Sequence, residues 1–466
     1  MILSWPTGKQ YVWAVLGFVG LEVVSWLAYT GPRSEQIVAA AAVITAVVLA
    51  GKRLTWLAYA TVAELVVGSK GYLLFLTIGQ TRISLRILLF TIFIGATLPR
   101  LVKHWSALRS SVLSNSFLWF AGWLAAAAFI GIARHNGLGD VYRDANAWLF
   151  LALLPAWWLT IRGDPVWRQR LILLLIAGAT VTGVKSLLTL YAFGHDLPNI
   201  QQIYRWIRNT GVGEVTYINA NIYRVFFQSQ IYALLAFGVT LVGWIAGRAR
   251  PWFIIPMALS ALAVYISLSR SFWVGLAVGL AVIIAGLIYR RQWKSAARLW
   301  IIVPVAAFSW AVTVWALTVP SSGVAGGANI VVARLNGGGT VDASAARRNQ
   351  IRPLFTAIGR HPVWGSGFGT TVSFYSADPR IRGWRTTAAF ELGYLDLWLK
   401  IGLLGIVLYL IWLWGLWRRL RRSPWSLIFM SGGLALIAVH ATSPYLNHPL
   451  GLGWLMLIAL YAHDPG

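Results

Sequence analysis

The chain has 466 residues, of which 58% are hydrophobic and only 11% are charged. Soluble domains carry about 25% charged residues, so the composition excludes a soluble globular enzyme and predicts an all-α polytopic membrane protein. The lack of cysteine excludes disulfides and thiolate metal sites.

The net charge is +26, from 39 Lys and Arg residues against 13 Asp and Glu residues. In a soluble protein such a charge would suggest binding to nucleic acid. In a membrane protein the positive-inside rule explains much of it, because cytoplasmic loops are rich in Lys and Arg. We therefore expect membrane lipids and no nucleic acid among the partners.

Fourteen apolar stretches of the sequence reach or approach the length that crosses a bilayer as a helix, which is ~20 residues. Because several are short, we expect about 12–14 membrane helices. The first run lacks a small-residue cleavage pattern, so we interpret it as a retained span and not a signal peptide. The stretches are residues 11–30, 36–50, 54–68, 83–99, 115–133, 145–161, 171–193, 220–246, 252–268, 272–289, 299–318, 389–416, 425–442 and 450–463.

Alternate connections between these stretches are basic, and placing all of them inside puts both termini in the cytoplasm. We expect one transmembrane domain over residues 1–466, with a large outward loop inserted at 319–388. The basic connections contain Lys52 and Arg53; Arg100, Lys103 and Arg109; Arg162, Arg168 and Arg170; Arg248 and Arg250; Arg290, Arg291, Lys294 and Arg298; and Arg418, Arg419, Arg421 and Arg422.

Residues 252–289 are nearly all apolar. As a single helix they would extend roughly 57 Å, against a hydrocarbon core of about 30 Å. The run must therefore fold back, and we predict a break at Ser267–Ser271 that lies outside together with Arg270.

The outward loop 319–388 is strongly basic. Loops of this length cross the membrane regardless of charge, so membrane topology does not explain these basic residues. They therefore indicate an anionic partner: either lipid head groups or a phosphorylated substrate, whose oxygens fit guanidinium groups. The loop contains Arg334, Arg347, Arg348, Arg352, Arg360, Arg380, Arg382 and Arg385, against Asp342 and Asp378 as acids.

Within this loop, residues 342–362 have apolar residues at helical spacing. Asp342 and Ser344 are possible N-caps, and Pro353 predicts a break or restart. The following stretch HPVWGSGFGT (361–370) has glycine at every second position from Gly365 to Gly369. Since glycine permits positive φ and close backbone approach, this pattern predicts either a tight turn or a cradle for phosphate.

Three ionisable residues fall at the outer ends of predicted spans. Arg224 lies in the span 220–246, Arg270 in the predicted break, and Glu391 near the start of the span 389–416. Each also has a structural interpretation: a snorkelling side chain, an interfacial anchor, and an ion pair with a loop arginine, respectively. Together, two cations and a carboxylate can bind a lipid diphosphate and deprotonate a hydroxyl nucleophile, which requires no metal.

Other polar residues are interpreted as structural. Asp396 and Lys400 have the i,i+4 spacing of an ion pair on a helix. His195 and Asp196 come nearest to a metal-ligand pattern, and we interpret them as loop polarity. We therefore expect no metal and no cofactor.

Four motifs occur in an order that resembles the O-antigen ligase and O-antigen polymerase superfamily. The resemblance runs from about residue 219 to the end, over half of the chain, and residues 64–86 also look like the N-terminal part of the family. The motifs are ISLSRSFWVG (266–275), RRNQIRPLFTAIGRHPVWGSGFG (347–369), ELGYLDLWLKIGLLG (391–405) and ATSPYLNHPLG (441–451).

The resemblance implies a GT-C-like, metal-independent, inverting glycosyltransferase of the bacterial inner membrane, with its active site facing the periplasm. Such enzymes take a glycan from undecaprenyl diphosphate in lipopolysaccharide and other cell-envelope polysaccharide biosynthesis. They pass it to lipid A–core, to another lipid-linked glycan, or to a protein hydroxyl.

By motif position, the resemblance implies that Arg224 and Arg270 contact the diphosphate and that Glu391 is the catalytic base. Ligases typically have a histidine, often followed by asparagine, where this chain has Glu391 and Leu392, so the residue favours a polymerase-type member. His361 belongs to the turn that precedes the glycines. Further candidates for substrate contact are Arg347, Arg348, Arg385 and Tyr394.

Three alternatives remain open at this point. One is a protein O-oligosaccharyltransferase, and another is a non-catalytic flippase or transporter of lipid-linked glycan. Glu22, near the middle of a span, favours transport, although a hydrogen bond between helices also explains it. The third is a lipid-binding scaffold, in which Glu391 would be dispensable.

Overall fold

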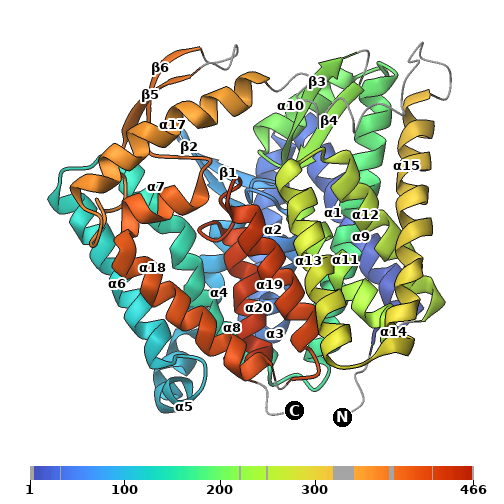
Figure 1. Ribbon diagram of the computed structural model, residues 1–466, viewed down its shortest axis with the longest axis horizontal. Coiled ribbons are helices and arrows are strands. Elements are labelled where there is room, and N and C mark those ends of the chain that lie inside the picture. Colours follow the sequence, from blue (N-terminus) through green and yellow to red (C-terminus); the bar gives the residue numbers. More distant parts are fainter. Residues whose placement is uncertain are drawn as a thin grey trace. The chain divides into compact units, whose positions relative to one another are not determined.

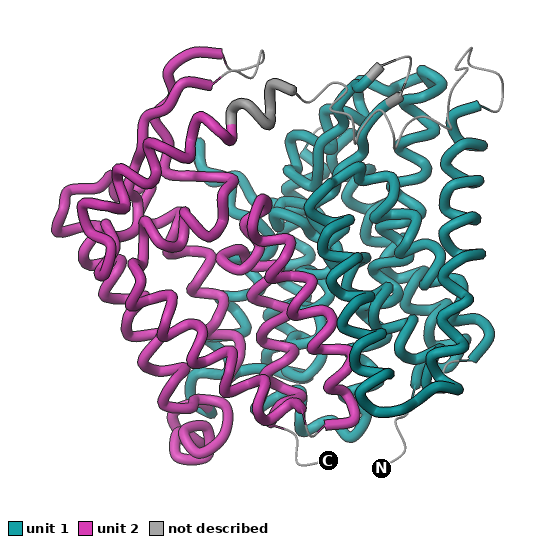
Figure 2. Tube along the Cα trace, viewed as in Figure 1, with its two compact units in different colours: residues 1–100, 156–333 teal, residues 101–155, 334–466 magenta. Residues whose placement is uncertain are grey.

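The computed structural model describes residues 5–31, 33–219, 222–247, 250–318, 341–376, 382–421 and 423–463. The chain divides into two compact units (Figure 2): unit 1 contains Met1–Arg100 and Ala156–Ala333, and unit 2 contains Leu101–Pro155 and Arg334–Gly466. Some residues considered above lie outside the described residues: Arg248, Arg334, Asp378, Arg380, Arg422 and the side chains of Asp342 and Ser344.

Unit 1 is built from helices and two antiparallel β-hairpins (Figure 1). The hairpins pair β1 (Phe75–Ile78) with β2 (Thr81–Ser84), and β3 (Gly213–Asn219) with β4 (Ile222–Phe227). The helices are α1 (Gly8–Thr30), α2 (Ser34–Lys52), α3 (Leu54–Val67), α4 (Leu85–Lys103), α8 (Leu153–Ile161), α9 (Trp167–Gly194), α10 (Ile200–Asn209), α11 (Gln230–Ile245), α12 (Ile254–Ile266), α13 (Arg270–Tyr289), α14 (Trp293–Ala297) and α15 (Ile302–Thr318), with 3₁₀ turns η2 (Pro251–Phe253) and η3 (Arg298–Ile301). The last three residues of α4 and the first three of α8 are counted in unit 2.

Unit 2 combines helices with one antiparallel hairpin, formed by β5 (Val372–Ser376) and β6 (Gly383–Thr387). Figure 1 shows α17 and this hairpin at the end of the unit where α18 begins. The helices are α5 (Trp105–Ser110), α6 (Asn115–Ala133), α7 (Leu138–Leu149), α17 (Val341–Arg360), α18 (Gly393–Leu420), α19 (Ser426–His440) and α20 (Pro449–Ala462), with the 3₁₀ turn η1 (Phe150–Ala152).

Among the described residues, eight helices are long and apolar enough to cross a membrane, and five further apolar helices have 10–17 residues. This confirms the predicted all-α polytopic membrane architecture. The eight are α1, α2, α4, α6, α9, α13, the run Trp293–Thr318 that includes α15, and α18; the shorter ones are α3, α11, the run Pro251–Ile266 that includes α12, α19 and α20.

The helix α9 is the centre of unit 1, where it packs against α1, α3, α11 and α12. In the most apolar 18-residue stretch of α9, 67% of the residues are buried inside the protein. Gly178 and Gly183 allow the close approach, because a Cβ atom would lie 2.4 Å from a side-chain carbon of Val66 or from the carbonyl oxygen of Leu259. Small residues at such contacts let membrane helices pack backbone to backbone.

Two glutamates inside apolar runs of unit 1 are paired with cations from other helices. Glu64 of α3 accepts from Nε of Arg86 in α4 at 2.6 Å and from Nη2 at 3.1 Å. Glu22 of α1 accepts from Nζ of Lys185 in α9 at 2.8 Å. The structural interpretation of Glu22 as a partner in a bond between helices is therefore confirmed.

The predicted span 220–246 is wrong at its beginning. Residues 222–227 form the strand β4, and the helix α11 begins only after it. The stretch IYRVFF is rich in β-branched and aromatic residues, which favour strands. Val225 and Phe227 are fully buried in the apolar core of unit 1. Arg224 therefore lies on a β-hairpin and not on a membrane helix.

The break predicted at Ser267–Ser271 is confirmed between α12 and α13. Leu268 has a φ of 45°, a left-handed conformation that a helix cannot contain. Ser267 Oγ stabilises the turn by donating to the Val264 carbonyl at 2.6 Å and accepting from the Ser269 N–H at 3.2 Å. The helix α13 then starts at Arg270.

The helix predicted over 342–362 is confirmed as α17, but the break expected at Pro353 is wrong, because α17 continues through it. Leu354 and Ile358 follow the proline and are buried in an apolar cluster with Val372 and Leu399. This burial offsets the hydrogen bond that proline removes from a helix.

The helix α18 is interrupted at Gly402, whose φ of 67° and ψ of 178° are not helical. The glycine-rich segment 361–369 bonds the backbone groups that the interruption leaves without helical partners. Four hydrogen bonds of 2.6–3.1 Å join the two backbones: from the N–H groups of Leu403 and Leu404 to the carbonyls of Pro362 and Val363, and from those of Ser366 and Gly367 to the carbonyls of Leu399 and Lys400.

Candidate functional site

Unit 1 brings Arg224 to the break that contains Arg270. The Nε atom of Arg224 donates to the carbonyl oxygen of Ser267 at 3.0 Å, and Arg270 is the first residue of the helix after this turn. The two arginines predicted to contact a diphosphate therefore belong to one local feature, although they are far apart in the sequence.

The orientation of Arg224 follows from the strand that carries it. Successive side chains of a strand point to opposite faces, so burial of Val225 and Phe227 in the core directs Arg224 to the other face. There its guanidinium carbon lies 4.7 Å from the centre of the Phe226 ring, a cation–π distance. Ring and carbonyl together fix the guanidinium at the break, whereas the side chain of Arg270 is exposed.

Unit 2 brings Arg347 and Glu391 together. The Nε atom of Arg347 in α17 donates to Oε2 of Glu391 at 2.5 Å. The side chains remain 40% and 58% exposed. Glu391 precedes α18, which begins at Gly393, so the carboxylate is not buried within the apolar run. The ion pair with a loop arginine that the sequence allowed is present, and the carboxylate also remains accessible.

An apolar cluster fixes the turn that carries Glu391. The neighbouring Phe390 is 3% exposed. It packs with Leu354 and Ile358 of α17, Val372 of β5 and Leu399 of α18. One small apolar core within unit 2 therefore holds together the β5–β6 hairpin, α17 and the turn that carries Glu391.

The other candidates of unit 2 lie on α17, β6 and α18. Arg348 is exposed beside Arg347 on α17, and Arg385 is exposed on β6. The hydroxyl of Tyr394 donates to the Ile437 carbonyl at 2.7 Å, which ties α18 to α19. His361 lies in the predicted turn. Desolvation lowers the pKa of His361, as do the positive charges of Arg134 and Arg360.

The alternating glycines of segment 361–369 do not form a phosphate cradle. Gly365, Gly367 and Gly369 all have positive φ, but the N–H groups of residues 366–369 already bond to protein oxygens. A Cβ atom on Gly365 would lie 2.5 Å from the backbone nitrogen of Gly402. The glycines permit close backbone packing instead.

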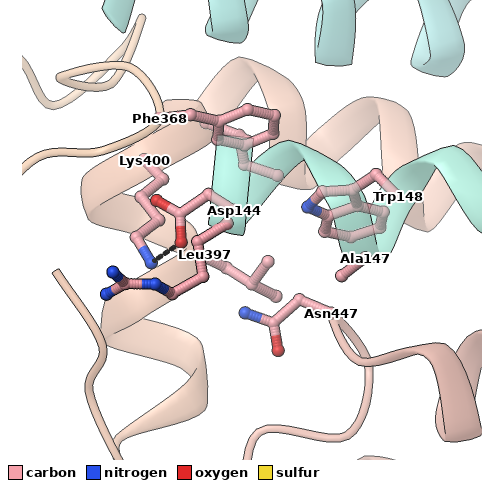
Figure 3. Close-up of a pocket in the computed structure, with 9 residues that line it drawn as sticks. Asp144, Ala147, Trp148, Phe368, Leu397, Lys400 and Asn447 are labelled. Carbon is pink, nitrogen blue, oxygen red and sulfur yellow. Dashed lines mark hydrogen bonds and ion pairs between the residues drawn. The ribbon is translucent and has the colours of Figure 1, made fainter. Parts of the chain in front are cut away.

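A buried ion cluster stabilises the same region of unit 2, and Figure 3 shows its Lys400–Asp144 pair. Nζ of Lys400 lies 2.7 Å from the carboxylates of both Asp396 and Asp144. Asp144 also accepts from the N–H of Gly369, and Asp396 accepts from Asn447, each at 2.7 Å. The pairing of Asp396 with Lys400 was predicted, and mutual compensation is what allows such charges to be buried.

Asp144 is the member of this cluster that sequence reasoning missed. The signal was an acidic residue in YRDANAWLF, directly ahead of an apolar run. A cavity of about 60 Å³ adjoins the cluster. Its lining includes the Trp148, Phe368 and Leu397 side chains (Figure 3). We interpret the cluster as a structural contact that holds α7, α18 and segment 361–369 together.

Among the side chains that the structure describes, no group of three or more His, Cys, Asp or Glu residues is placed to hold a metal ion. His195 instead contacts the Tyr191 carbonyl at 3.0 Å through Nδ1, and its ring stacks on that of Tyr191. The interpretation of His195 as loop polarity agrees with these contacts.

Comparison with known proteins gave one family. Residues 255–410, about a third of the chain, match a family model described as O-antigen ligase. This range contains Arg270, Arg347 and Glu391, and Arg224 lies before it. No curated protein and no solved structure matched the chain.

Proposed function

We propose that this chain, by its residues 255–410 a member of the O-antigen ligase and polymerase superfamily, transfers a glycan from an undecaprenyl diphosphate-linked donor to an acceptor hydroxyl. The reaction takes place at the outer face of the bacterial inner membrane, inverts the donor's anomeric configuration and needs no metal. The acceptor is a second lipid-linked glycan in a polymerase and lipid A–core in a ligase. Glu391 at the position where ligases typically have histidine favours the polymerase.

The observation that supports this proposal most is that the Glu391 side chain is both ion-paired and exposed. It lies within the matched range, Arg347 orients its carboxylate at 2.5 Å, and 58% of its side chain is exposed. A carboxylate that is both oriented and accessible can accept a proton from an incoming hydroxyl.

The proposed reaction is a single displacement. The acceptor oxygen attacks the anomeric carbon of the donor sugar, the bond from that carbon to the diphosphate oxygen breaks, and its electron pair leaves with the diphosphate. The hydroxyl proton passes to the carboxylate of Glu391. Arg224 and Arg270 stabilise the negative charge that grows on the diphosphate, because guanidinium donors form strong bonds to phosphate oxygens.

One observation against transport also bears on the choice of function. Glu22 was the residue that favoured a flippase or transporter, and in the structure it is ion-paired with Lys185 at 2.8 Å. Both side chains are only 13% exposed. This pairing gives Glu22 a structural role within unit 1.

The proposal is tested by reconstitution. Purified protein in lipid nanodiscs, with EDTA and a lipid diphosphate-linked oligosaccharide, is expected to form a product visible on a gel. Glu391→Gln should lower turnover about 10²–10⁴-fold, the usual contribution of a general base. Glu214→Gln is the matched control, because Glu214 is exposed and only weakly paired with Arg208 at 3.3 Å.

The arginines are tested by donor binding. Arg224→Ala and Arg270→Ala should each weaken binding of the lipid diphosphate about tenfold or more, because each removes a charge-assisted hydrogen bond. Unchanged turnover in Glu391→Gln would exclude the base role. Product formation that stops in EDTA and returns with Mg²⁺ would contradict the metal-independent mechanism.

Polymerase and ligase are separated by the surface glycan of a deletion strain. Loss of chain length with a single repeat still attached to lipid A–core indicates a polymerase. Polymer that is made but remains unattached indicates a ligase. Normal glycan with loss of glycosylated protein indicates an O-oligosaccharyltransferase.

A further inference from the structure

One face of the β5–β6 hairpin in unit 2 has no protein covering in the described structure. The strands pair Tyr375 with Trp384 and Ser373 with Thr386. Side chains that face each other across two strands lie on the same side of the sheet, so these four residues form one surface, called here the hairpin face. All four are exposed, and Trp384 is exposed by 76%.

The opposite face of the hairpin packs onto the protein. Val372 and Phe374 alternate with the exposed residues and are 8% and 6% exposed. Val372 belongs to the apolar cluster that also contains Phe390, the neighbour of Glu391. In addition, Nδ2 of Asn349 in α17 donates to the Tyr375 carbonyl at 3.1 Å. The hairpin face is therefore held in a fixed relation to Glu391 within the same unit.

The hairpin face carries two flat aromatic rings beside two hydroxyl groups. The rings of Tyr375 and Trp384 are 6.2 Å apart at 83° to each other, which is the edge-to-face geometry that aromatic pairs prefer. The hydroxyls of Ser373 and Thr386 are 2.7 Å apart. Nε of Arg382 approaches the Tyr375 hydroxyl at 3.4 Å.

This combination fits a sugar chain better than a lipid. The C–H faces of pyranose rings pack on flat aromatic rings, while sugar hydroxyls exchange hydrogen bonds with Ser and Thr hydroxyls and with arginine. A lipid anchor would add aliphatic residues to its aromatic ones, and the hairpin face has none.

We propose that the hairpin face is a glycan subsite, in which Trp384 and Tyr375 stack on sugar rings of the oligosaccharide that the enzyme transfers or extends. The inference rests on the proposed function for the identity of that oligosaccharide. These two side chains bind the glycan at a distance from its reacting hydroxyl and hold the substrate near Glu391. They take no part in bond formation, so Trp384 and Tyr375 are positioning residues.

The direct test measures binding of the glycan without its lipid. The probe is the water-soluble oligosaccharide released by mild acid from the lipid-linked glycan of the cells that make this protein. Saturation-transfer NMR with the full-length protein in nanodiscs should show transfer to sugar ring protons. The double variant Trp384→Ala/Tyr375→Ala should reduce it about fivefold or more, because it removes both aromatic rings on which the sugar stacks.

Two variants serve as controls. Trp384→Tyr retains a flat ring and should keep binding within about twofold of the wild type. Trp119→Ala removes another exposed tryptophan of unit 2, on the apolar helix α6, and should not change binding. Equal saturation transfer in the wild type and the double variant would overturn the subsite.

The transfer assay separates this inference from the proposed function. If the wild type forms product, the double variant should raise the acceptor KM about fivefold or more with little change in kcat, because a remote contact contributes to binding only. Product formation with an unchanged KM overturns the subsite and leaves the glycosyltransferase intact. If the wild type forms no product, the proposed function fails, and the NMR result alone decides whether the hairpin face binds glycan.

A spin label distinguishes a glycan subsite from a membrane anchor. The chain has no cysteine, so Thr386→Cys gives a single labelling position on the hairpin face. We expect the label to be accessible to a water-soluble nickel chelate in nanodiscs. Accessibility dominated by oxygen would place the face in the acyl region and overturn the proposal.

Discussion

Burial decides how much each ion pair contributes to the stability of this protein. Glu64 and Arg86 form a bidentate pair with side chains only 7% and 5% exposed. Glu214 and Arg208 form a longer pair at 3.3 Å, with side chains about half exposed. Water screens the second pair but not the first. The same substitution should therefore have very different effects at the two sites.

Glu64→Ala should destabilise the protein by about 3–5 kcal/mol, because it leaves the buried guanidinium of Arg86 without a counter-charge. Glu214→Ala should change stability by at most about 1 kcal/mol. Thermal unfolding in one detergent measures both. Equal unfolding midpoints for the two variants would show that Arg86 finds another partner.

Arg347 is expected to act on the reaction through Glu391. Arg347→Ala removes the contact that orients the carboxylate, and we expect kcat to fall about tenfold while binding of the lipid diphosphate is unchanged. Arg352→Ala is the control, an exposed arginine further along the same helix α17. A loss of donor binding in Arg347→Ala would instead make Arg347 a contact to the diphosphate.

The specific partner of a residue was predictable from the sequence only where the contact is local. The bond between Asp396 and Lys400 follows from i,i+4 spacing on a helix, and the structure confirms it at 2.7 Å. Asp144, the second partner of Lys400, lies far away in the chain. Periodicity gives no information about which helices meet, so this partner could not be predicted.

At the scale of elements, α18 depends on its glycine. The φ of 67° with a ψ of 178° at Gly402 belongs to a region that essentially only glycine occupies. A Cβ atom there would lie 2.3 Å from both the Gly365 nitrogen and the Val363 carbonyl oxygen. Neither neighbour can move without breaking the bonds between segment 361–369 and α18.

Gly402→Ala should therefore destabilise the protein by about 3 kcal/mol or more, the sum of backbone strain and the clash. Gly415→Ala in the same helix meets no atom closer than 3.8 Å and should be neutral or slightly stabilising. The two unfolding midpoints in the same detergent give the comparison. A small effect of Gly402→Ala would mean that the interruption can relax into a continuous helix.

Elements with a strong hydropathic signal were predicted well, and elements that compete with that signal were not. The break at Ser267–Ser271 followed from length alone, and it is present. The strand β4 was predicted as helix because its apolar residues continue directly into α11, so hydropathy shows one run. The β-branched and aromatic residues of IYRVFF favour a strand, and Val225 and Phe227 of this strand pack in the core.

At the scale of the whole molecule, the distribution of charge predicts orientation. The arginines and lysines of alternate connections predict that both termini are cytoplasmic. The described helices agree with the predicted polytopic membrane protein. The order of elements along the chain was thus largely predictable, whereas the division into two compact units was not, because it depends on contacts between distant segments.

Single cysteines test this orientation, since the natural chain has none. Ala389→Cys, an exposed position before Glu391, should react with a membrane-impermeant maleimide in spheroplasts. Ser110→Cys, an exposed position at the end of α5, should react only after the membrane is permeabilised. The reverse pattern would place Glu391 on the cytoplasmic side and contradict the proposed reaction with an outward-facing donor.

The interruption of α18 also has a consequence for biosynthesis. A helix with unbonded backbone groups enters lipid at a cost of several kcal/mol per group. Segment 361–369, which bonds these groups, precedes α18 and therefore leaves the ribosome first. We expect this segment of the outward loop to pair with α18 as that helix inserts. Translation that stops soon after Gly402 should leave the segment unpaired and sensitive to added protease.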